Sequence, residues 1–294
     1  MGSNDSKSMK TYNCFQFYNE LDILEIRLQE GWDTTDYFVI SEASHTHSGK
    51  SKEYVLLDNW ERFKPYADKI KRIQVDESIE EQSRVFPGET PEWVREKYQR
   101  YALGRGLTEV QPNDLIVISD LDEIPRSEII GMIQEDANDY DRYILKIPHF
   151  HFRINYMRIH PTVTIPNIIV VKGRAFTNTM SERQFTFPWF SPPPNTVFLE
   201  HGGWHFTDFG NDEHVINKLK SFCHIEQDVP KFLDVINIEN LIANKIDRDA
   251  GPEKKFEYVK VDDYFPKCIF ENLDRWNHMI IPNAEYHVED FYNL

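Results

Sequence analysis

Cysteine is scarce in this sequence, and its number is odd. The 294 residues contain three cysteines, Cys14, Cys223 and Cys268, which cannot all be paired within the chain. Small domains that depend on disulfides carry an even and denser set. We therefore expect a protein of a reducing compartment with no required disulfide, whose cysteines are small buried apolar side chains.

Positive charge is also in short supply. Lysine and arginine number 33 against 49 aspartates and glutamates, which leaves a formal net charge of −16. This balance argues against nucleic acid as a partner and against peripheral binding to anionic membrane, because both need an excess of basic side chains. A metal–phosphate site stays compatible with it, since a divalent cation reverses the local sign of the charge.

The sequence shows no signal peptide and no apolar run of transmembrane length. We expect no membrane span and a cytoplasmic location. Residues 1–10 are polar and rich in glycine and serine, which predicts a disordered tail or a cloning remnant. The sequon at Asn4 lies in that tail, as expected of a chain that does not enter a secretory lumen.

What the sequence does have is a long apolar run that ends in acids. Residues 115–125 read LIVISDLDEIP, which predicts a strand buried on both faces of a parallel sheet, with Asp120, Asp122 and Glu123 at its carboxyl end. Asp-x-Asp supplies two hard oxygen donors suited to Mg²⁺ or Mn²⁺ that holds a substrate's phosphates. Alternatively, Asp122 or Glu123 caps a helix that begins near Arg126.

The first half of the chain predicts an α/β unit of nucleotide-binding type. Residues 12–18 read as a strand, residues 20–30 as a helix capped by Asn19, and residues 37–40 as a second strand. That second strand is followed by Ser41-Glu42 and a polar loop, and residues 70–75 read as a third strand. We expect residues 11–148 to form one half of a single domain, and residues 149–294 the other half with C-terminal helices.

A further helix follows Thr90-Pro91 and leads to the strand that ends in acids. It carries Arg95 and, four residues apart, Glu96 and Arg100. We favour the interpretation that Glu96 and Arg100 form a surface ion pair. Alternatively, the Arg100 guanidinium faces the diphosphate of a substrate.

The second half changes in composition. Residues 149–194 combine short predicted strands with many aromatics and the segment FPWFSPPP, whose prolines place it at a rim or a site wall. Trp189 and Phe190 are the aromatics that we expect to be exposed platforms for sugar rings. Residues 200–226 crowd histidines and acids around Gly202-Gly203, which indicates a site more than a core. These residues are His201, His205, His224, Glu200, Asp208, Asp212 and Glu213.

Five stretches in matching order resemble glycosyltransferase family 17, whose animal members are β-1,4-mannosyl-glycoprotein N-acetylglucosaminyltransferases. They are FQFYNELDILEIRL (15–28), VISEASHTHSGKSK (39–52), EKYQRYALGRGL (96–107), residues 115–125, and residues 202–206 with 220–224. The resemblance implies a GT-A fold, with a Rossmann-like, mostly parallel central sheet flanked by helices and a smaller acceptor-side region. Without a membrane anchor or luminal stem, the chain resembles a soluble microbial or viral member, in the host cytoplasm if viral.

The resemblance also implies the chemistry of the site. It implies a UDP-sugar donor, Mn²⁺ or Mg²⁺, an oligosaccharide or glycoprotein acceptor and inversion at the anomeric carbon. We expect Asp120, Asp122 and His205 to hold the metal. Phe17, Asn19 and Glu42 would frame uridine and ribose, and Arg95 or Arg100 would pair with phosphate. The remaining donor-site candidates are Thr46, Lys52, Asp120, Leu121, Gly203 and Trp204.

The catalytic base and the class of activity stay open at this point. Asp208 and Glu213 are the leading candidates to accept the proton of the acceptor hydroxyl, with Glu200 behind them. Glu123 is less suitable, because it is needed to orient the metal-binding turn. The competing classes are a glycan- or nucleotide-binding module without turnover, and a metal-dependent phosphohydrolase or nucleotidyltransferase, which needs further carboxylates for a second metal. The sequence does not specify the oligomeric state.

Overall fold

The computed structural model describes residues 9–210, 212–221, 237–246 and 255–292. Its strands are β1 (Thr11–Phe17), β2 (Tyr37–Ala43), β3 (Ile70–Val75), β4 (Leu115–Ile118), β5 (Glu123–Pro125), β6 (Arg142–His151), β7 (Tyr156–His160), β8 (Thr164–Lys172), β9 (Thr196–Leu199), β10 (Gly203–Thr207) and β11 (Lys255–Tyr258). Its α-helices are α1 (Leu21–Glu30), α2 (Val55–Asp58), α3 (Trp60–Phe63), α4 (Ile79–Val85), α5 (Pro91–Ala102), α6 (Ser127–Glu135), α7 (Thr179–Arg183), α8 (Asp212–Ser221), α10 (Ile238–Ala243), α11 (Lys267–Phe270) and α12 (Leu273–Trp276). Short 3₁₀ helices are η1 (Lys64–Lys69), η2 (Leu103–Gly106), η3 (Gln184–Thr186), η5 (Asn277–Met279) and η6 (Val288–Phe291).

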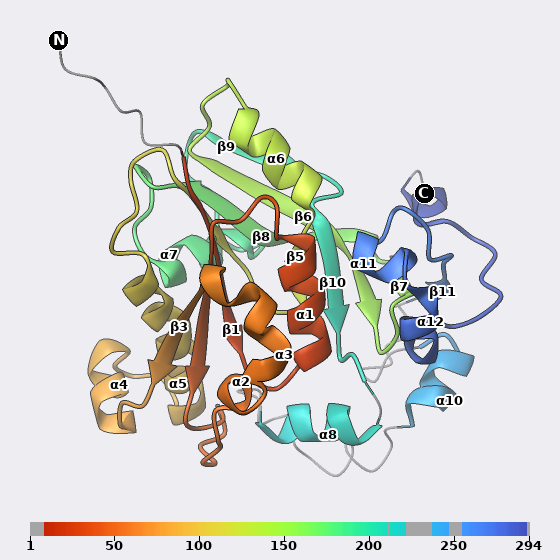
Figure 1. The fold of residues 1–294 in the computed structure, drawn as a ribbon, viewed down its shortest axis with the longest axis horizontal. Helices are drawn as coiled ribbons and strands as arrows, with labels where there is room; N and C mark the ends of the chain where they lie inside the picture. Colours follow the sequence, from red (N-terminus) through yellow and green to blue (C-terminus); the bar gives the residue numbers. More distant parts are fainter. Residues whose placement is uncertain (1–8, 211, 222–236, 247–254, 293–294) are drawn as a thin grey trace.

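The strands join in one sheet, whose main path runs β11-β7-β6-β8-β4-β1-β2-β3. On this path β4, β1, β2 and β3 are parallel neighbours, whereas β8, β6, β7 and β11 continue it antiparallel. Strands β9 and β10 lie parallel to β6 off the main path, and β5 pairs with β10. The predicted α/β class, a central sheet flanked by helices, is confirmed (Figure 1). Strand β6 crosses the predicted boundary at residue 148.

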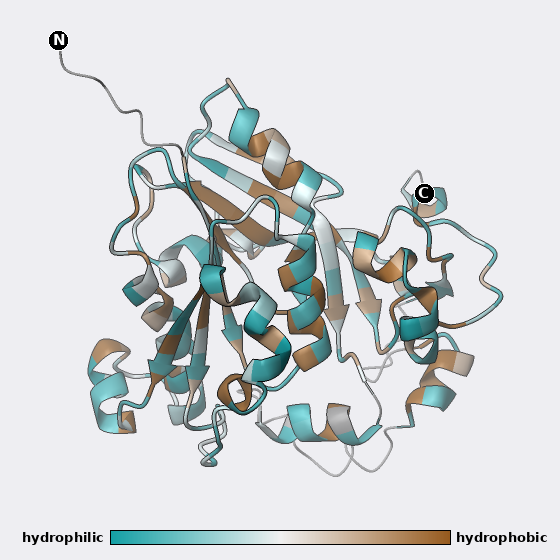
Figure 2. Ribbon diagram, viewed as in Figure 1, coloured by the Kyte–Doolittle hydropathy of each residue, from teal (hydrophilic) through white to brown (hydrophobic). Residues whose placement is uncertain are grey.

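Strand β4 is buried on both of its faces, as its apolar run predicts. Ile116 and Ile118 pack in a cluster with Cys14 of β1, and Leu115 and Val117 pack in another with α6. All four β4 side chains are at most 1% exposed. Burial of one such side chain stabilises the fold by about 1.5–3 kcal/mol. In Figure 2, brown segments recur along the strands of the sheet, and α1 alternates between brown and teal.

The parallel strands direct their carboxyl ends to one edge of the sheet, and α8 lies across that edge (Figure 1). The Tyr18 hydroxyl, just beyond β1, lies 2.7 Å from the Ser221 hydroxyl of α8. The Ser48 hydroxyl, in the loop that follows β2, donates to the carbonyl of Lys220 at 2.9 Å. These contacts fasten α8 over the edge at which the Asp-x-Asp turn emerges from β4.

Two predicted details of local structure are wrong. Helix α1 begins at Leu21 with Glu20 in the capping position, so Asn19 does not cap it. Neither Asp122 nor Glu123 caps α6, because Glu123 lies in β5 and α6 begins at Ser127. The helix-cap alternative for the acidic turn is thereby excluded, and the carboxylates are available for other contacts.

The Gly-Gly turn serves strand packing. A Cβ atom on Gly202 would lie 2.3 Å from the Cβ of Leu145 in β6. Gly203 has a φ of +155°, and a Cβ on it would lie 2.0 Å from the carbonyl oxygen of Ile124. These glycines therefore let β10 approach its neighbouring strands, and the space beside Gly203 is filled by backbone, not by a donor substrate.

Candidate active site

A buried arginine holds the acidic turn in place. Arg27 of α1 is 0% exposed and its guanidinium donates to the carbonyl oxygens of Asp120, Leu121 and Glu123 at 2.5, 3.1 and 3.0 Å. Its second terminal nitrogen donates to the side-chain oxygen of Asn13 in β1 at 2.6 Å. One cation thus satisfies three carbonyls of a non-repetitive segment and ties that segment to α1 and β1.

Glu123 orders the same turn from its other side. One carboxylate oxygen accepts from the backbone N–H of Asp120 at 2.7 Å. The other accepts from the Asn167 amide of β8 and from the Arg183 guanidinium of α7, both at 2.7 Å. The carboxylate is 1% exposed and fully engaged, so Glu123 is a positioning residue and not a base.

Two guanidinium groups contact the Asp120 carboxylate. Arg100 donates to one oxygen at 2.7 Å, and Arg183 lies 3.3 Å from the other, while 41% of the side chain stays exposed. Burial raises the pKa of Asp120, but Arg100 and Arg183 outweigh it and hold that pKa well below its usual range. The expectation of a surface Glu96–Arg100 pair is wrong, since both side chains are buried and the pair faces the acidic turn.

Asp122 lies against a lysine and a histidine. Its carboxylate oxygens are 3.1 Å from the Lys218 ammonium of α8 and 3.5 Å from Nε2 of His205 in β10. Burial raises the pKa of Asp122, but the opposing effects of Lys218 and then His205 are larger. The pKa is therefore held well below its usual value, and the carboxyl is ionised. The structure thus brings the predicted pair Asp122 and His205 together.

Lys218 is at the centre of an acidic cluster. Its ammonium lies 3.1 Å from Asp122 and 3.9 Å from both Asp208 and Glu20. Asp208 is 3% exposed and has a φ of +52°, a backbone conformation that non-glycine residues rarely adopt. Burial lowers the pKa of Lys218, but Asp122 and Asp208 outweigh it and raise the pKa, which keeps the amine charged.

His205 belongs to a chain of polar side chains. Its Nδ1 lies 3.3 Å from Nε2 of His149 in β6, and that nitrogen lies 3.1 Å from the Asn167 side-chain oxygen. Burial lowers the pKa of His205, but Asp122 outweighs it and raises that pKa above its usual value. Burial and the neighbouring His205 hold the pKa of His149 well below the usual value, so His149 is neutral.

The donor atoms suit a divalent cation, but they are not assembled as a metal centre. Across residues 9–210, 212–221, 237–246 and 255–292, no group of three or more His, Cys, Asp or Glu side chains has a metal-holding arrangement. The Lys218 ammonium stands in for a cation among the carboxylates of Asp122, Asp208 and Glu20. Carboxylate oxygens around a cation position fit Mn²⁺ or Mg²⁺ chemically, provided that Lys218 withdraws.

Several predicted donor-site residues lie in the core instead. Phe17, Leu121 and Trp204 are at most 5% exposed and belong to one apolar cluster, so their side chains cannot frame a nucleotide. The Trp204 indole N–H donates to the carbonyl of Tyr264 at 3.2 Å. These residues contribute by packing beneath the site.

Other predicted residues shape the loop after β2. Lys52 pairs with Glu42 at 3.0 Å. The Thr46 hydroxyl accepts from the Lys50 N–H at 3.0 Å, and Arg95 donates to the carbonyl of His47 at 3.1 Å. The buried side-chain oxygen Oδ1 of Asn19 and Oε2 of Glu42 have no hydrogen-bond partner in the described part of the chain. Two buried acceptors at the ends of β1 and β2 therefore lack a donor from the described residues.

Of the three predicted bases, one lies in the cluster. Asp208 lies beside Lys218, whereas Glu200 binds Lys146 at 2.7 Å and the Thr164 hydroxyl at 3.0 Å. Glu213 is exposed in the first turn of α8. Asn211, Phe222, Cys223 and His224 fall outside the described residues.

The sequence-based predictions missed Glu20, Arg27, His149, Asn167, Arg183 and Lys218. A signal existed for Arg27, which lies three residues after Leu24 and beside Leu28 on the apolar stripe of its helix. Lys218 likewise follows Val215 by three residues on the apolar side of α8. A basic residue on a buried helix face needs an anionic or carbonyl partner. That requirement identifies both Arg27 and Lys218 as candidates for contacts with the acidic turn.

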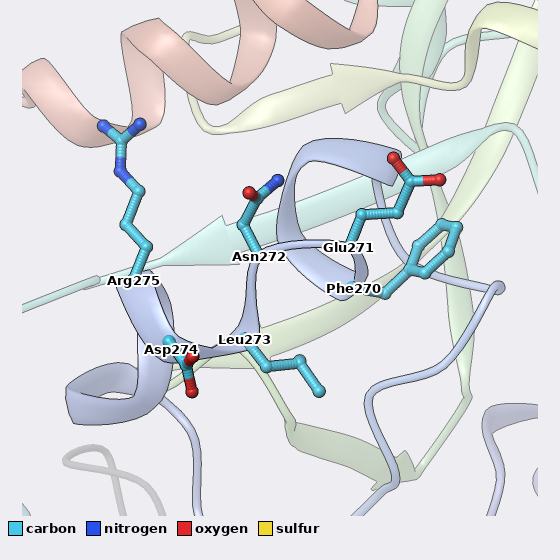
Figure 3. Close-up of a pocket in the computed structure, with 6 residues that line it drawn as sticks. All are labelled: Phe270, Glu271, Asn272, Leu273, Asp274 and Arg275. Carbon is cyan, nitrogen blue, oxygen red and sulfur yellow. The ribbon is translucent and has the colours of Figure 1, made fainter.

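A hollow of about 460 Å³ near the C-terminus is a separate feature. It is lined by residues 270–275 of α11, α12 and their connecting turn (Figure 3). The Phe270 and Arg275 side chains point away from each other, and Arg275 pairs with Glu25 at 2.7 Å. Of the polar side chains that line it, Glu271, Asp274 and Arg275 point in different directions (Figure 3), so these lining residues offer no convergent set of polar groups. No helix among the described residues has the length and apolarity needed to span a bilayer.

Comparison with known proteins agrees with the sequence resemblance. The sequence model of glycosyltransferase family 17 matches residues 3–258. The human β-1,4-mannosyl-glycoprotein 4-β-N-acetylglucosaminyltransferase is 22% identical over 308 positions, covering 92% of this chain and 55% of that protein. Its counterpart from Rattus norvegicus is 27% identical over 308 positions, covering 92% and 54%. The chain therefore spans about half the length of the curated relatives it matches.

Two solved structures are similar at low sequence identity. S. aureus TarS 1-349 aligns with a TM-score of 0.39 and 11% identity, covering 80% of this chain and 78% of that chain. Francisella tularensis 2-C-methyl-D-erythritol 4-phosphate cytidylyltransferase aligns with a TM-score of 0.31 and 12% identity, covering 65% and 90%.

Proposed function

The chain belongs to glycosyltransferase family 17, and from that membership we propose that it transfers a sugar from a UDP-sugar to a hydroxyl of a glycan. The relatives are named as N-acetylglucosaminyltransferases, so GlcNAc is the proposed sugar and an oligosaccharide or glycoprotein the proposed acceptor. The transfer is proposed to invert the anomeric carbon and to depend on Mn²⁺ or Mg²⁺.

One observation carries the proposal. The two aspartates that follow β4 lie at the carboxyl edge of the sheet, in contact with three cationic side chains, Arg100, Arg183 and Lys218. A UDP-sugar carries two negative charges on its diphosphate, and binding it in a partly buried site needs positive charge in fixed positions. At this edge the three cations are shared with the carboxylates that they contact, so the metal would supply the further positive charge that the diphosphate needs.

The residues that would hold the metal are Asp122 and His205, with Asp120 binding it directly or through water. A bound Mn²⁺ or Mg²⁺ would supply a Lewis acid that stabilises negative charge on the departing diphosphate. Lys218 would leave Asp122 and pair with the diphosphate. Arg100 and Arg183 keep Asp120 ionised and oriented, and Arg27 keeps the turn in one conformation.

Asp208 is the proposed base. In an inverting displacement the acceptor oxygen forms a bond to the anomeric carbon, and the bond from that carbon to the diphosphate oxygen breaks. The hydroxyl proton passes to the Asp208 carboxylate, and UDP leaves with the electron pair of the broken bond. The Asp208 carboxylate is buried and lies 3.9 Å from the Lys218 ammonium, and as base it would have to face the side of the sugar ring opposite the leaving diphosphate.

The uridine would lie on the side of β1 and β2. The unpaired buried oxygens of Asn19 and Glu42 are acceptors, and the base and the ribose both offer donors, an N–H and hydroxyls. An unsatisfied buried acceptor costs about 1–3 kcal/mol, so a ligand that supplies its hydrogen bond gains affinity.

A panel of nucleotide sugars tests the donor assignment. The midpoint of thermal unfolding is measured with UDP-GlcNAc, UDP-glucose, UDP-galactose, UDP-xylose and GDP-mannose, each with and without Mn²⁺. A ligand that binds the native state raises the midpoint by mass action. We expect a Mn²⁺-dependent rise with one UDP-sugar that is lost in Asp122→Ala. The absence of a rise with every nucleotide sugar would overturn the proposal.

The release of UDP then separates the classes of activity. UDP release that requires an added glycan acceptor supports the transferase. Equal release without acceptor would instead indicate a phosphohydrolase. Donor binding with no release under either condition would indicate a binding module without turnover.

A further inference from the structure

Two aromatic rings stack on the protein surface beside the candidate site. The Phe187 and Trp189 ring centroids are 5.2 Å apart and the ring planes are within 1° of parallel. Trp189 is 74% exposed and Phe187 39% exposed. Exposed aromatic surface on this scale is unfavourable in water, and it is more informative than scattered exposed leucines. The exposed ring pair is therefore suited to bind a ligand with a flat apolar face.

The local backbone holds these rings in place. Pro188 separates them and Pro192 follows closely, and each proline fixes its own φ angle. The N–H of Phe187 donates to the carbonyl of Gln184 in η3 at 3.0 Å, and the N–H of Phe190 donates to the carbonyl of Phe187 at 3.1 Å. Rings that are already positioned lose little conformational entropy when a ligand binds.

Arg183 connects this ring pair to the acidic turn. Its guanidinium carbon lies 5.6 Å from the Phe187 ring centroid, while the same group donates to Glu123 at 2.7 Å and lies 3.3 Å from Asp120. The platform, defined as Phe187 and Trp189, is thus within one arginine side chain of the proposed reaction site.

The topology assigns the platform to the side opposite the donor base. In the sheet, β4 lies between β1 on one side and β8 on the other. Asn19 and Glu42, the proposed uridine contacts, come from the ends of β1 and β2. Arg183, in contrast, donates to the carbonyl of Asn167 in β8, and its guanidinium carbon lies 5.6 Å from the Phe187 ring centroid. A ligand on the platform would therefore approach Asp120 from the side that the donor leaves open.

We propose that Phe187 and Trp189 form an acceptor subsite, on which a pyranose ring of a neutral oligosaccharide stacks by its C–H face. This inference rests on the proposed transferase function. Stacked nucleobases are the other common ligands of exposed aromatics, but their binding also requires a positively charged groove for phosphates. A chain of net charge −16 disfavours the binding of phosphates. A neutral glycan is not repelled by this negative charge.

Saturation-transfer NMR with a neutral biantennary N-glycan, observed on the glycan protons, tests the subsite. The wild-type chain is compared with Trp189→Ala, Trp189→Phe and, as a matched control, Phe198→Ala, whose ring on β9 is 46% exposed. We expect saturation of the glycan to be lost in Trp189→Ala, partly kept in Trp189→Phe and unchanged in Phe198→Ala. In the transfer assay Trp189→Ala should raise the acceptor KM roughly 3- to 10-fold, as for one lost aromatic contact, with the donor KM unchanged.

The outcomes separate this inference from the function on which it rests. Glycan saturation and acceptor KM that are unchanged in Trp189→Ala would overturn the subsite while the donor panel still supports a transferase. No glycan saturation in the wild type would overturn it as well. A donor KM that rises in Trp189→Ala would assign the platform to the nucleotide and not to the acceptor. A failed donor panel with glycan saturation that depends on Trp189 would leave a glycan-binding module.

Discussion

The Arg27 guanidinium donates to the main-chain carbonyl of Asp120 at 2.5 Å, although the two residues are 93 positions apart in the chain. This bond joins the first helix to the turn that follows the central strand. It is one of several hydrogen bonds from Arg27 to backbone carbonyls and neutral side chains. Arg27 is fully buried and forms no direct ion pair with a carboxylate among the described residues. The charge is instead neutralised by carbonyl and amide dipoles, so the geometry of the turn depends on it.

Replacing Arg27 with methionine should destabilise the whole domain. The change removes the Arg27 donor from the Leu121 carbonyl and the Asn13 side-chain oxygen, and it takes one of several donors from the carbonyls of Asp120 and Glu123. A buried acceptor left without a donor costs about 1–3 kcal/mol. We expect the free energy of unfolding to fall by about 3 kcal/mol or more, measured by urea denaturation. Lys64→Met is the control, since Lys64 is exposed and its ion pair with exposed Glu61 contributes about 1 kcal/mol or less. Equal losses for the two variants would contradict a structural role specific to Arg27.

Asp122→Asn should abolish the response to metal and donor together. The amide keeps the shape of the side chain but removes the negative charge that faces Lys218 and His205. We expect the rate of sugar transfer to fall by about 100-fold or more, the scale of a lost electrostatic contact at a reaction centre. Asp139→Asn is the control, because Asp139 is a surface residue paired with Lys172 and Arg174. A full thermal response to UDP-sugar and Mn²⁺ in Asp122→Asn would contradict the assignment.

The local sequence pattern was sufficient to predict β4, the strand that carries the acidic turn. Four apolar residues followed by acids predict a buried strand with carboxylates at its carboxyl end, and β4 has that structure. Residues 12–18 are likewise predicted as a strand, and β1 spans Thr11–Phe17 in the core. Such features depend on neighbours within a few residues, which the sequence displays directly.

The partners of those carboxylates could not be read in the same way. Arg183 bonds to Glu123 across 60 positions and Lys218 to Asp122 across 96, so no local pattern records either contact. The helical spacing of Glu96 and Arg100 matches a surface pair equally well. Only the packing of α5 against the sheet turns that pair toward Asp120 and buries it. For Trp204, an aromatic beside Gly-Gly resembles a ligand platform until β10 is placed within the core.

Glu25 should make the stability of the domain depend on acid pH. Its carboxylate pairs with Arg62 at 2.5 Å and with Arg275 at 2.7 Å, joining α1 to α3 and α12. Burial raises the pKa of Glu25, but its bonds to Arg275 and Arg62 outweigh it and lower the pKa below 4.5. The unfolded chain therefore binds the proton more readily, and the stabilisation is present above pH 4.5 and lost as the pH falls through the folded pKa.

The comparison of wild type with Glu25→Gln checks this sign. The difference in free energy of unfolding between them should be largest above pH 4.5 and should shrink as the pH falls below it. Urea denaturation from pH 3 to pH 7 supplies the measurement. Glu128→Gln, at an exposed position in the first turn of α6, is the control. A difference for Glu25→Gln that is constant over this range would show that the carboxylate does not titrate with folding.

Lys218→Gln should strengthen the binding of Mn²⁺ to the chain without a donor. In the structure the Lys218 ammonium lies among the carboxylates of Asp122, Asp208 and Glu20, so a metal ion at Asp122 must displace it. Removing the ammonium frees the carboxylates and leaves their mutual repulsion, which a divalent cation relieves. We expect the Kd for Mn²⁺ to fall roughly tenfold, equivalent to about 1.4 kcal/mol, measured by the electron paramagnetic resonance signal of free Mn²⁺.

The same substitution should act in the opposite direction on the donor. Once Lys218 has left Asp122, its charge is available to the diphosphate, so Lys218→Gln should weaken UDP binding in the presence of saturating Mn²⁺. Lys220→Gln is the matched control, since Lys220 lies two residues along α8 and forms no ion pair with this cluster in the part of the chain that the structure describes. Stronger metal binding together with weaker UDP binding would identify Lys218 as a cation that exchanges between the site's carboxylates and its substrate. Unchanged Mn²⁺ affinity in Lys218→Gln would instead show that the lysine and the metal do not compete, and Asp122 would then bind the metal beside the ammonium.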